Sequence, residues 1–273
     1  MDFLIAAIMG LIEGITEWLP VSSTGHLILA ERIFLFNQPE EFVSMFRVVI
    51  QLGAILAVVV LFFGKLWPIG RRTTRDGEFL MFKMPVLRLW GRVLVGTIPA
   101  LVLGLLLDDW LDAHLYNYIV VAAMLILYGI FFILVERFPR PVKVRTVQDI
   151  TLTQALIIGF WQVLAMIPGT SRSGATIVGG MLLGLSRAAV AEFTFYLAIP
   201  VMAGASFLKV LKFLLGAGSF TLMQLGILAV GCLVAFLVSL FAIRFLMNYV
   251  KKHTFTAFGW YRIALGVLVL LVM

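Results

Sequence analysis

Long runs of apolar residues recur from one end of the chain to the other, with short polar segments between them. A helix needs about 20 apolar residues to cross roughly 30 Å of hydrocarbon, and most of these runs come close to that length. They are continuous rather than alternating, a pattern that favours helices over the strands of a barrel. The pattern predicts an all-α polytopic membrane protein with a single membrane domain over 1–273. Ten apolar segments carry this prediction: 3–19, 24–36, 44–64, 90–107, 116–135, 152–167, 174–186, 190–214, 221–248 and 256–273.

Two of these segments, 24–36 and 174–186, are too short to span a membrane. Each follows the preceding segment across a turn that contains proline or glycine. We therefore expect two re-entrant helical hairpins, 3–19 with 24–36 and 152–167 with 174–186, beside six full spans. Irregular backbone at membrane depth is tolerated only where protein or a water-filled cavity covers it, so both turns should lie inside the protein.

The two halves of the chain are weakly similar when they are compared with a shift of 149 positions. The matching pairs are Gly10 with Gly159, Glu13 with Gln162, Ser22 with Ser171, Gly25 with Gly174, and Phe46 with Phe195. We expect one repeat over 1–136 and a second over 150–273, each with one hairpin and three spans. Three is odd, so the second repeat begins on the opposite side of the membrane, as an inverted repeat. Folds of this kind place their sites near the midplane, where broken helices meet.

Charge is scarce and unevenly placed: 62% of the residues are hydrophobic, 13% are charged, and the net charge is +7. The basic residues gather in short loops, most densely in 65–92 and 136–151, as the positive-inside rule expects of cytoplasmic loops. This placement argues against nucleic-acid binding. The acidic loop at 108–112 is then expected outside, and the first hairpin opens to the outer face. The lone cysteine, Cys232, excludes an intramolecular disulfide and a cysteine metal cluster.

The first group of residues suited to chemistry lies in 13–26. Glu13 and Glu17 are four positions apart, so a helix presents both carboxylates on one face. Two close carboxylates repel each other unless a cation or a proton lies between them, and hard oxygen ligands suit Mg²⁺ or Ca²⁺. Pro20 disfavours a continuing helix. The run Ser22-Ser23-Thr24 that follows is typical of a new helix N-terminus, which can bind an anion, and His26 lies within one turn of Ser23.

A second, similar group lies in 168–176, where a break is followed by hydroxyl residues and a predicted helix start. Arg172 adds a planar set of donors that suits a phosphate group. A charged arginine inside an apolar stretch is costly and needs a partner or a polar cavity. Ser171, Ser173 and Thr176 flank it as further candidate phosphate ligands.

Each feature also has a plainer interpretation. Two glutamates inside a membrane are compatible with a proton or Na⁺ site, and inverted repeats with broken helices are typical of secondary transporters or lipid flippases. Hydroxyl groups in membrane helices often bond only to helix backbone. Tryptophans such as Trp18 are expected to be anchors at the membrane interface. The combination of two acids, a histidine, an arginine and clustered hydroxyls at the two turns favours an enzyme.

Together the two motifs resemble the undecaprenyl-pyrophosphate phosphatase family, which is linked to bacitracin resistance. The resemblance rests on E-x-x-x-E followed by L-P-V-S-S-T-G-H in 13–26 and on P-G-x-S-R-S-G-A-T in 168–176, and it covers the whole chain. Type 2 phosphatidic-acid phosphatases also act on this lipid, but their signature requires a histidine where this chain has Val178. We therefore exclude that family, although it shares the Ser-Arg pair.

The resemblance implies a bacterial inner-membrane enzyme that converts undecaprenyl pyrophosphate to undecaprenyl phosphate, the carrier lipid of peptidoglycan precursors. It also implies a divalent metal ion and a site that opens to the outer face. We expect Glu13 and Glu17 to hold this Mg²⁺ or Ca²⁺ against the pyrophosphate. Whether the chain is a monomer or a homodimer stays open.

On the same basis, Ser23 is the favoured nucleophile, with His26 or Glu17 as its general base. Attack by a metal-bound water, or by His26 itself, is a further alternative. Arg172 is expected to clamp the phosphoryl oxygens. The other expected phosphate ligands are hydroxyl residues of the two turns: Ser22, Thr24, Ser171, Ser173 and Thr176.

Overall fold

The computed structural model describes residues 1–74, 77–217 and 219–273. Within this part of the chain, helices account for most of the structure. Their bounds are α1 (Asp2–Thr16), α2 (Ser23–Ile33), α3 (Glu40–Leu61), α4 (Phe63–Leu66), α5 (Met84–Leu115), α6 (Tyr118–Arg137), α7 (Leu152–Val163), α8 (Arg172–Leu182), α9 (Arg187–Ala217), α10 (Leu222–Tyr249) and α11 (Thr256–Val272). Two short strands, β1 (Ile69–Thr74) and β2 (Gly77–Phe82), complete the fold.

Among the described residues, five helices are long and apolar enough to cross a membrane, namely α3, α5, α6, α9 and α10. The sixth predicted span corresponds to α11, which is apolar but only 17 residues long. The two short segments are α2 and α8, with 11 residues each. These lengths confirm an all-α polytopic membrane protein, and each short helix packs against the helix before it, α2 on α1 and α8 on α7.

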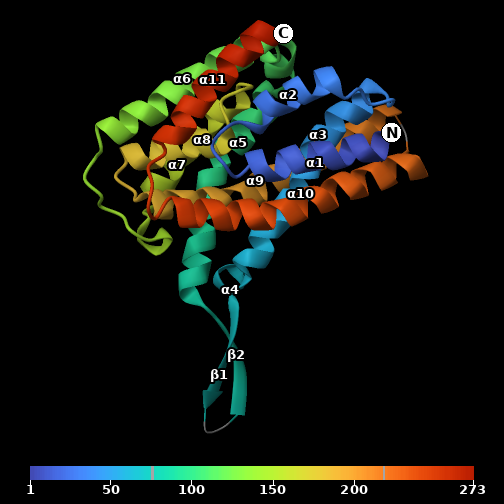
Figure 1. Cartoon of the computed structure of the whole chain (residues 1–273). Helices are drawn as coiled ribbons and strands as arrows, with labels where there is room; N and C mark the ends of the chain where they lie inside the picture. Colours follow the sequence, from blue (N-terminus) through green and yellow to red (C-terminus); the bar gives the residue numbers. More distant parts are fainter. Residues whose placement is uncertain (75–76, 218) are drawn as a thin grey trace.

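Two predicted loops differ from the structure. Helix α5 runs for 32 residues, so the acidic positions 108–112 belong to a helix and not to a loop. The prediction for this segment followed only its apolar residues, whereas the helix continues beyond them at both ends. The basic segment 65–92 contains the end of α4, the start of α5 and, between them, an antiparallel hairpin in which Ile69 pairs with Phe82 and Arg71 with Leu80. This β-hairpin projects away from the helices (Figure 1).

Equivalent helices of the two halves make equivalent contacts. Helix α1 packs on α10 and α7 packs on α5, so the first helix of each half contacts the second span of the other half. Both contacts use a glycine: a Cβ at Gly10 would lie 2.5 Å from the carbonyl oxygen of Gly231, and one at Gly159 would lie 2.3 Å from that of Gly96. Such close approach requires residues without side chains. The orientation of the halves in a membrane stays a prediction.

Both short helices contact α6. Helices α6 and α11 pack side by side, and both contact α2, while α6 also contacts α8 (Figure 1). The turns that precede α2 and α8 are thereby brought together inside the bundle.

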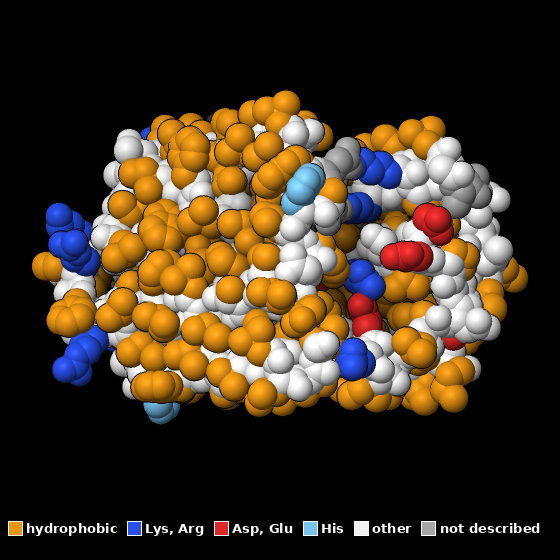
Figure 2. Space-filling view, turned by 90° about the horizontal axis from the view of Figure 1, so that it is seen from above, with side chains coloured by type: hydrophobic (Ala, Val, Ile, Leu, Met, Phe, Trp, Pro, Cys, Tyr) orange, Lys and Arg blue, Asp and Glu red, His pale blue; other side chains and the backbone are white. Residues whose placement is uncertain are grey.

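The surface agrees with a lipid environment. Figure 2 shows apolar side chains over most of the visible face, with lysine and arginine side chains at one end and again, beside acidic ones, around a hollow in the other half. Helix α10, for example, exposes Leu233, Leu237, Phe241 and Phe245. Contiguous exposed apolar surface of this extent is unusual for a protein in water and expected for one in lipid.

Candidate active site

The two turns that precede α2 and α8 have nearly the same backbone. Ser22 and Ser171 are the N-cap residues of these helices, and their φ angles are 74° and 71°. Each serine side chain accepts a hydrogen bond from the backbone of a glycine three positions later, Gly25 at 3.4 Å and Gly174 at 3.2 Å. A positive φ at a residue other than glycine costs about 1–3 kcal/mol and is found preferentially at functional sites.

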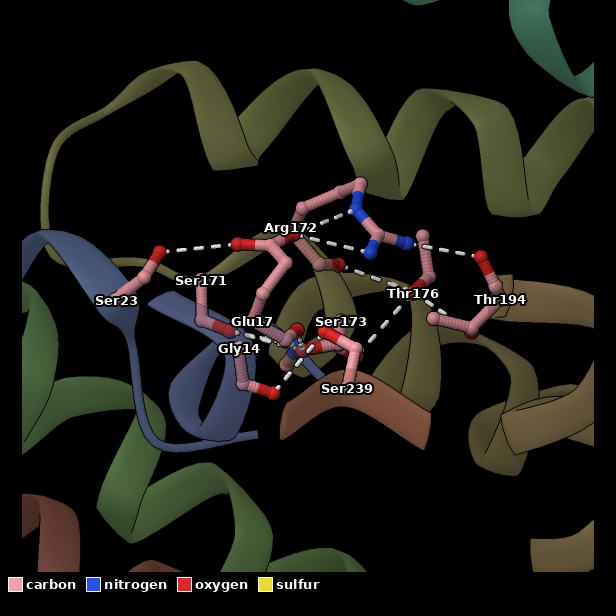
Figure 3. Close-up of polar contacts among 10 residues, drawn as sticks. Gly14, Glu17, Ser23, Ser171, Arg172, Ser173, Thr176, Thr194 and Ser239 are labelled. Atoms are coloured by element: carbon pink, nitrogen blue, oxygen red, sulfur yellow. Dashed lines mark hydrogen bonds and ion pairs between the residues drawn. The ribbon is translucent and has the colours of Figure 1, made fainter. Parts of the chain in front are cut away.

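The side chains of Glu17 and Arg172 connect the two turns. The Arg172 Nη2 atom lies 3.0 Å from Glu17 Oε1, and Nε donates to the same oxygen at 3.3 Å (Figure 3). Arg172 Nη1 also donates to the carbonyl oxygen of Thr194 at 2.8 Å. A guanidinium has five N–H donors, so this arrangement leaves two of them for a ligand.

The Trp18 ring packs against the arginine of this ion pair. The Arg172 guanidinium lies over the Trp18 ring, 5.6 Å from its centre, and Phe195 packs edge-on against the same ring. Trp18 is 0% exposed. The prediction that Trp18 anchors the protein at a membrane interface is therefore wrong: it follows Glu17 directly in the sequence and is carried inward with it.

Ser23 forms a contact suited to nucleophilic catalysis. Its Oγ donates to Glu17 Oε2 at 3.0 Å, while the other carboxylate oxygen of Glu17 faces Arg172 (Figure 3). A hydroxyl that donates to a carboxylate can lose its proton to that carboxylate as it attacks. All three residues line one cavity of about 520 Å³.

His26 has other partners. Its Nδ1 lies 2.7 Å from the carbonyl oxygen of Ser22, and its Nε2 lies 2.7 Å from the Tyr261 hydroxyl. A carbonyl oxygen only accepts, so Nδ1 carries the proton and Nε2 of the neutral ring accepts from Tyr261. Both nitrogens are therefore engaged away from Ser23. Of the two general bases predicted for Ser23, the geometry favours Glu17.

The predicted phosphate ligands fall into two groups. Thr24 and Ser171 line the cavity beside Ser23 and Arg172. Ser173 and Thr176 are fully buried and bonded within the protein: Ser173 Oγ donates to the Glu17 carbonyl oxygen at 3.1 Å, and Thr176 Oγ1 lies 2.8 Å from Thr194 Oγ1. The Ser22 hydroxyl is likewise buried and engaged as a helix cap. These three residues hold the turns in place from within the protein.

Glu13 is the one acidic side chain of the first turn region that lacks a partner. It is 0% exposed, and neither of its carboxylate oxygens has a hydrogen-bond partner among the described residues. The described part of the chain contains no group of three or more histidine, cysteine or acidic residues that could form a complete metal site. Mg²⁺ is commonly held by one or two carboxylates together with water and substrate phosphates. The pair Glu13 and Glu17 fits that smaller requirement.

The cavity has a polar end and an apolar wall. Glu17, Ser23, Thr24, Ser171 and Arg172 form the polar end. Helices α5 and α9 supply the apolar wall, through residues that include Leu101, Leu105, Val201, Phe207 and Leu208. A cavity of this kind suits an amphiphile with an anionic head and a hydrocarbon tail.

The sequence motifs omit two residues that the structure brings to the site. Tyr261 contacts His26, and its neighbour Arg262 is completely buried and bonded to backbone of both turns. A signal for Arg262 was present in the sequence, because it is the one charged residue in the predicted span 256–273. A charged residue inside a membrane helix marks a functional site by default. Tyr261 carries no comparable signal, because aromatic residues are common in such helices.

Fold and site together define an integral membrane protein with a cavity in which a serine hydroxyl and an arginine from the other half of the chain both contact one carboxylate. Comparison with known families agrees with this class. The model of the bacitracin resistance protein BacA family matches residues 6–268. The chain belongs to this family.

Curated relatives cover nearly the whole chain. A protein of Lactococcus lactis subsp. cremoris is 54% identical over 99% of this chain and 97% of its own length. A protein of Enterococcus faecalis is 53% identical over 97% of this chain and 95% of its own length. A protein of Streptococcus mutans is 55% identical over 97% of this chain and 94% of its own length. All three relatives are named undecaprenyl-diphosphatase.

Proposed function

We propose that this chain hydrolyses undecaprenyl pyrophosphate to undecaprenyl phosphate and inorganic phosphate, and so recycles the carrier lipid of cell-wall synthesis. The observation that carries the proposal is the contact of Ser23, Glu17 and Arg172 at the polar end of an otherwise apolar cavity. A nucleophile, a base and a phosphate-binding cation occupy one site there. The names of the relatives agree with the substrate.

The lining of the cavity supports a placement for each part of the substrate, the prenyl tail and the pyrophosphate head. The prenyl tail lies along the apolar wall formed by α5 and α9, where burial of hydrocarbon contributes about 0.8 kcal/mol per methylene. The pyrophosphate lies at the polar end, where the remaining Arg172 donors, Ser171 and Thr24 face the cavity. Hydrogen bonds from a guanidinium to phosphate are charge-assisted and bidentate, which fixes the orientation of the head group.

The chemical step follows from the Ser23–Glu17 contact. The Ser23 oxygen forms a bond with the terminal phosphorus, and its proton passes to Glu17. The bond between that phosphorus and the bridging oxygen breaks, Glu17 gives its proton to that oxygen, and undecaprenyl phosphate leaves. A water molecule then loses a proton to the freed Glu17 carboxylate and attacks the phosphoserine. The bond between phosphorus and the Ser23 oxygen breaks, Glu17 returns the proton to that oxygen, and inorganic phosphate departs. Arg172 stabilises the charge on the phosphoryl oxygens in both steps.

We further propose that Glu13 and Glu17 hold a Mg²⁺ or Ca²⁺ ion. The support is the orphaned, fully buried carboxylate of Glu13, four positions before Glu17 on the same helical face. When bound, such an ion supplies neutralising charge for a pyrophosphate.

The protein is proposed to reside in the bacterial plasma membrane with the cavity open to the outer face. Its apolar helices support the membrane location. The basic residues of 65–92 and 136–151 support the orientation, because such loops face the cytoplasm.

The experiment that tests the proposal measures phosphate release from undecaprenyl pyrophosphate by the purified chain in detergent, with and without EDTA. We expect metal-dependent release that is lost in Ser23→Ala and Arg172→Ala. If a folded, lipid-binding protein releases no phosphate, the proposal fails. Lipid flux in sealed vesicles then tests whether the inverted repeat serves transport instead.

A further inference from the structure

Arg262 of α11 lies between the two turns and is bonded to both. Its Nη1 donates to the carbonyl oxygen of Pro20 at 3.3 Å. Its Nη2 donates to the carbonyl oxygens of Gly169 and Thr170, each at 2.8 Å, and reaches that of Met124 at 3.4 Å. The guanidinium is 0% exposed. One side chain from outside both motifs therefore holds the backbone of both.

Two of the carbonyl groups that Arg262 contacts lie at equivalent positions of the two repeats. Pro20 and Gly169 are 149 positions apart, the same shift that relates Ser22 to Ser171. The guanidinium thus binds the same carbonyl position in each turn, two residues before the N-cap serine. A single residue that meets equivalent atoms of two repeats lies between them, and it sets how the turns are placed relative to each other.

All the hydrogen-bond acceptors of Arg262 within the described residues are neutral backbone carbonyls. A buried charge is expensive unless it is paired or fully hydrogen-bonded. The negative charge of a pyrophosphate in the adjoining cavity, which Gly169 and Ser171 line, offsets part of this cost when substrate is bound. A neutral residue at this position lacks that interaction with substrate.

The bond to Thr170 also orients a backbone donor. In a trans peptide the C=O and N–H groups point in opposite directions. The Thr170 carbonyl points to Arg262, so the N–H of Ser171 points away from Arg262. The Thr170 N–H already donates to Ile167 O at 3.2 Å, whereas the Ser171 N–H has no acceptor among the described residues. Ser171 itself lines the cavity.

We propose that Arg262 is a positioning residue that fixes the Thr170–Ser171 peptide so that the Ser171 N–H donates to a phosphoryl oxygen of the substrate. This inference deepens the proposed phosphatase function and rests on it. These bonds directly precede Ser171, whose φ of 71° is rare for a serine. A preorganised backbone N–H stabilises charge that develops in the transition state more than charge in the bound substrate.

The test compares Arg262→Lys and Arg262→Gly with wild type, by phosphate release from undecaprenyl pyrophosphate and by thermal unfolding. Arg244 provides the matched control, because it is an exposed arginine in the apolar helix α10. We expect Arg262→Lys to lower kcat roughly 100-fold, as removal of an oxyanion donor does, while KM changes by less than about threefold because the tail contacts remain. Arg244→Lys should leave both constants near those of wild type.

Arg262→Gly tests the geometry more directly. We expect this variant to be inactive and to regain activity in millimolar guanidinium chloride, because the free cation can donate to several carbonyls at once. Sodium chloride and methylammonium chloride at equal ionic strength should not restore it. If the variant unfolds alone, it is purified in guanidinium chloride and assayed before and after dialysis.

The outcomes separate this inference from the proposed function. An inactive wild type overturns the phosphatase proposal itself. With an active wild type, an Arg262→Lys variant as fast as Arg244→Lys overturns the role of Arg262. A rise in KM with unchanged kcat also overturns it, because Arg262 would then act on substrate binding. Absence of rescue in folded Arg262→Gly contradicts the proposed geometry.

Discussion

The turns that precede α2 and α8 have similar backbone conformations but carry different side chains at equivalent positions. Ser22 and Ser171 have φ angles within a few degrees of each other and cap their helices in the same way. With the repeat shift of 149 positions, however, Ser23 of the first turn corresponds to Arg172 of the second, and Glu17 corresponds to Met166. In the proposed mechanism the first half therefore supplies the nucleophile and the base, and the second half supplies the cation. Neither half alone contains all of these residues. The candidate site therefore forms only when the two halves pack together.

The largest effect is expected where the first turn loses its base. Glu17→Gln keeps the size of the side chain and its acceptor oxygen, but it cannot take the proton of Ser23 and it loses the charge that pairs with Arg172. We expect kcat to fall by about 1,000-fold or more, within the range of general-base catalysis. Phosphate release from saturating undecaprenyl pyrophosphate measures this. A variant with a tenth of normal activity would remove Glu17 as the base.

Arg172→Lys tests the second turn. Lysine keeps the charge but cannot donate to Glu17 and to the Thr194 carbonyl at once through a planar group. We expect a loss of roughly 100-fold in kcat/KM, smaller than that of Glu17→Gln. Near-normal kcat/KM in this variant would show that only positive charge, and not the guanidinium geometry, is needed.

A smaller effect is expected at Glu13, whose counterpart in the second half is Gln162. Glu13→Gln makes the two halves alike at this position and removes one proposed metal ligand. We expect the Mg²⁺ concentration for half-maximal activity to rise about 10-fold, because a ligand or its support typically contributes 10–100-fold to metal affinity. The measurement is a metal titration of phosphate release. A titration that overlays that of wild type would exclude Glu13 as a ligand.

The close helix contacts at Gly10 and Gly159 predict that an alanine at either position lowers the stability of the protein by a similar amount. In Gly10→Ala and Gly159→Ala the new Cβ would lie 2.5 Å and 2.3 Å from backbone oxygens of the facing helices. We expect each variant to lose about 1–3 kcal/mol of stability, as overpacked cores do. Gly91→Ala is the control, because a Cβ there meets nothing within 4 Å. Thermal unfolding in detergent measures all three, and equal stability of Gly159→Ala and the control would contradict the packing of α7 on α5.

Much of the fold could be predicted from the apolar pattern, because helix length in lipid is set by hydrocarbon thickness. The two short helices and their turns were predicted in this way. The extent of α5 and the β-hairpin at 69–82 were not. Charge in 65–92 indicates a side of the membrane but not a backbone conformation, and the pairing of Arg71 with Leu80 depends on a register that hydropathy does not report.

The sequence motifs contain residues that the structure brings together at the candidate site, but they indicate only part of the contacts between them. The motifs named Glu17, Ser23 and Arg172, because hydroxyls and charges at helix breaks in an apolar chain are rare. They did not indicate that Arg172 pairs with Glu17, a contact between residues 155 positions apart. The partner of His26 lies even farther away, at Tyr261. Contacts between distant segments depend on how the helices pack, which spacing within a motif does not specify.

The claim that the two halves form one site is tested most directly by a double-mutant cycle. Phosphate release from undecaprenyl pyrophosphate is measured for wild type, Glu17→Gln, Arg172→Lys and the double variant under identical conditions. Residues that act as one unit give strongly non-additive losses, so we predict that the double variant is about as slow as Glu17→Gln alone. If the two losses in kcat/KM instead multiply, Glu17 and Arg172 act independently, and the account of a single shared site is contradicted.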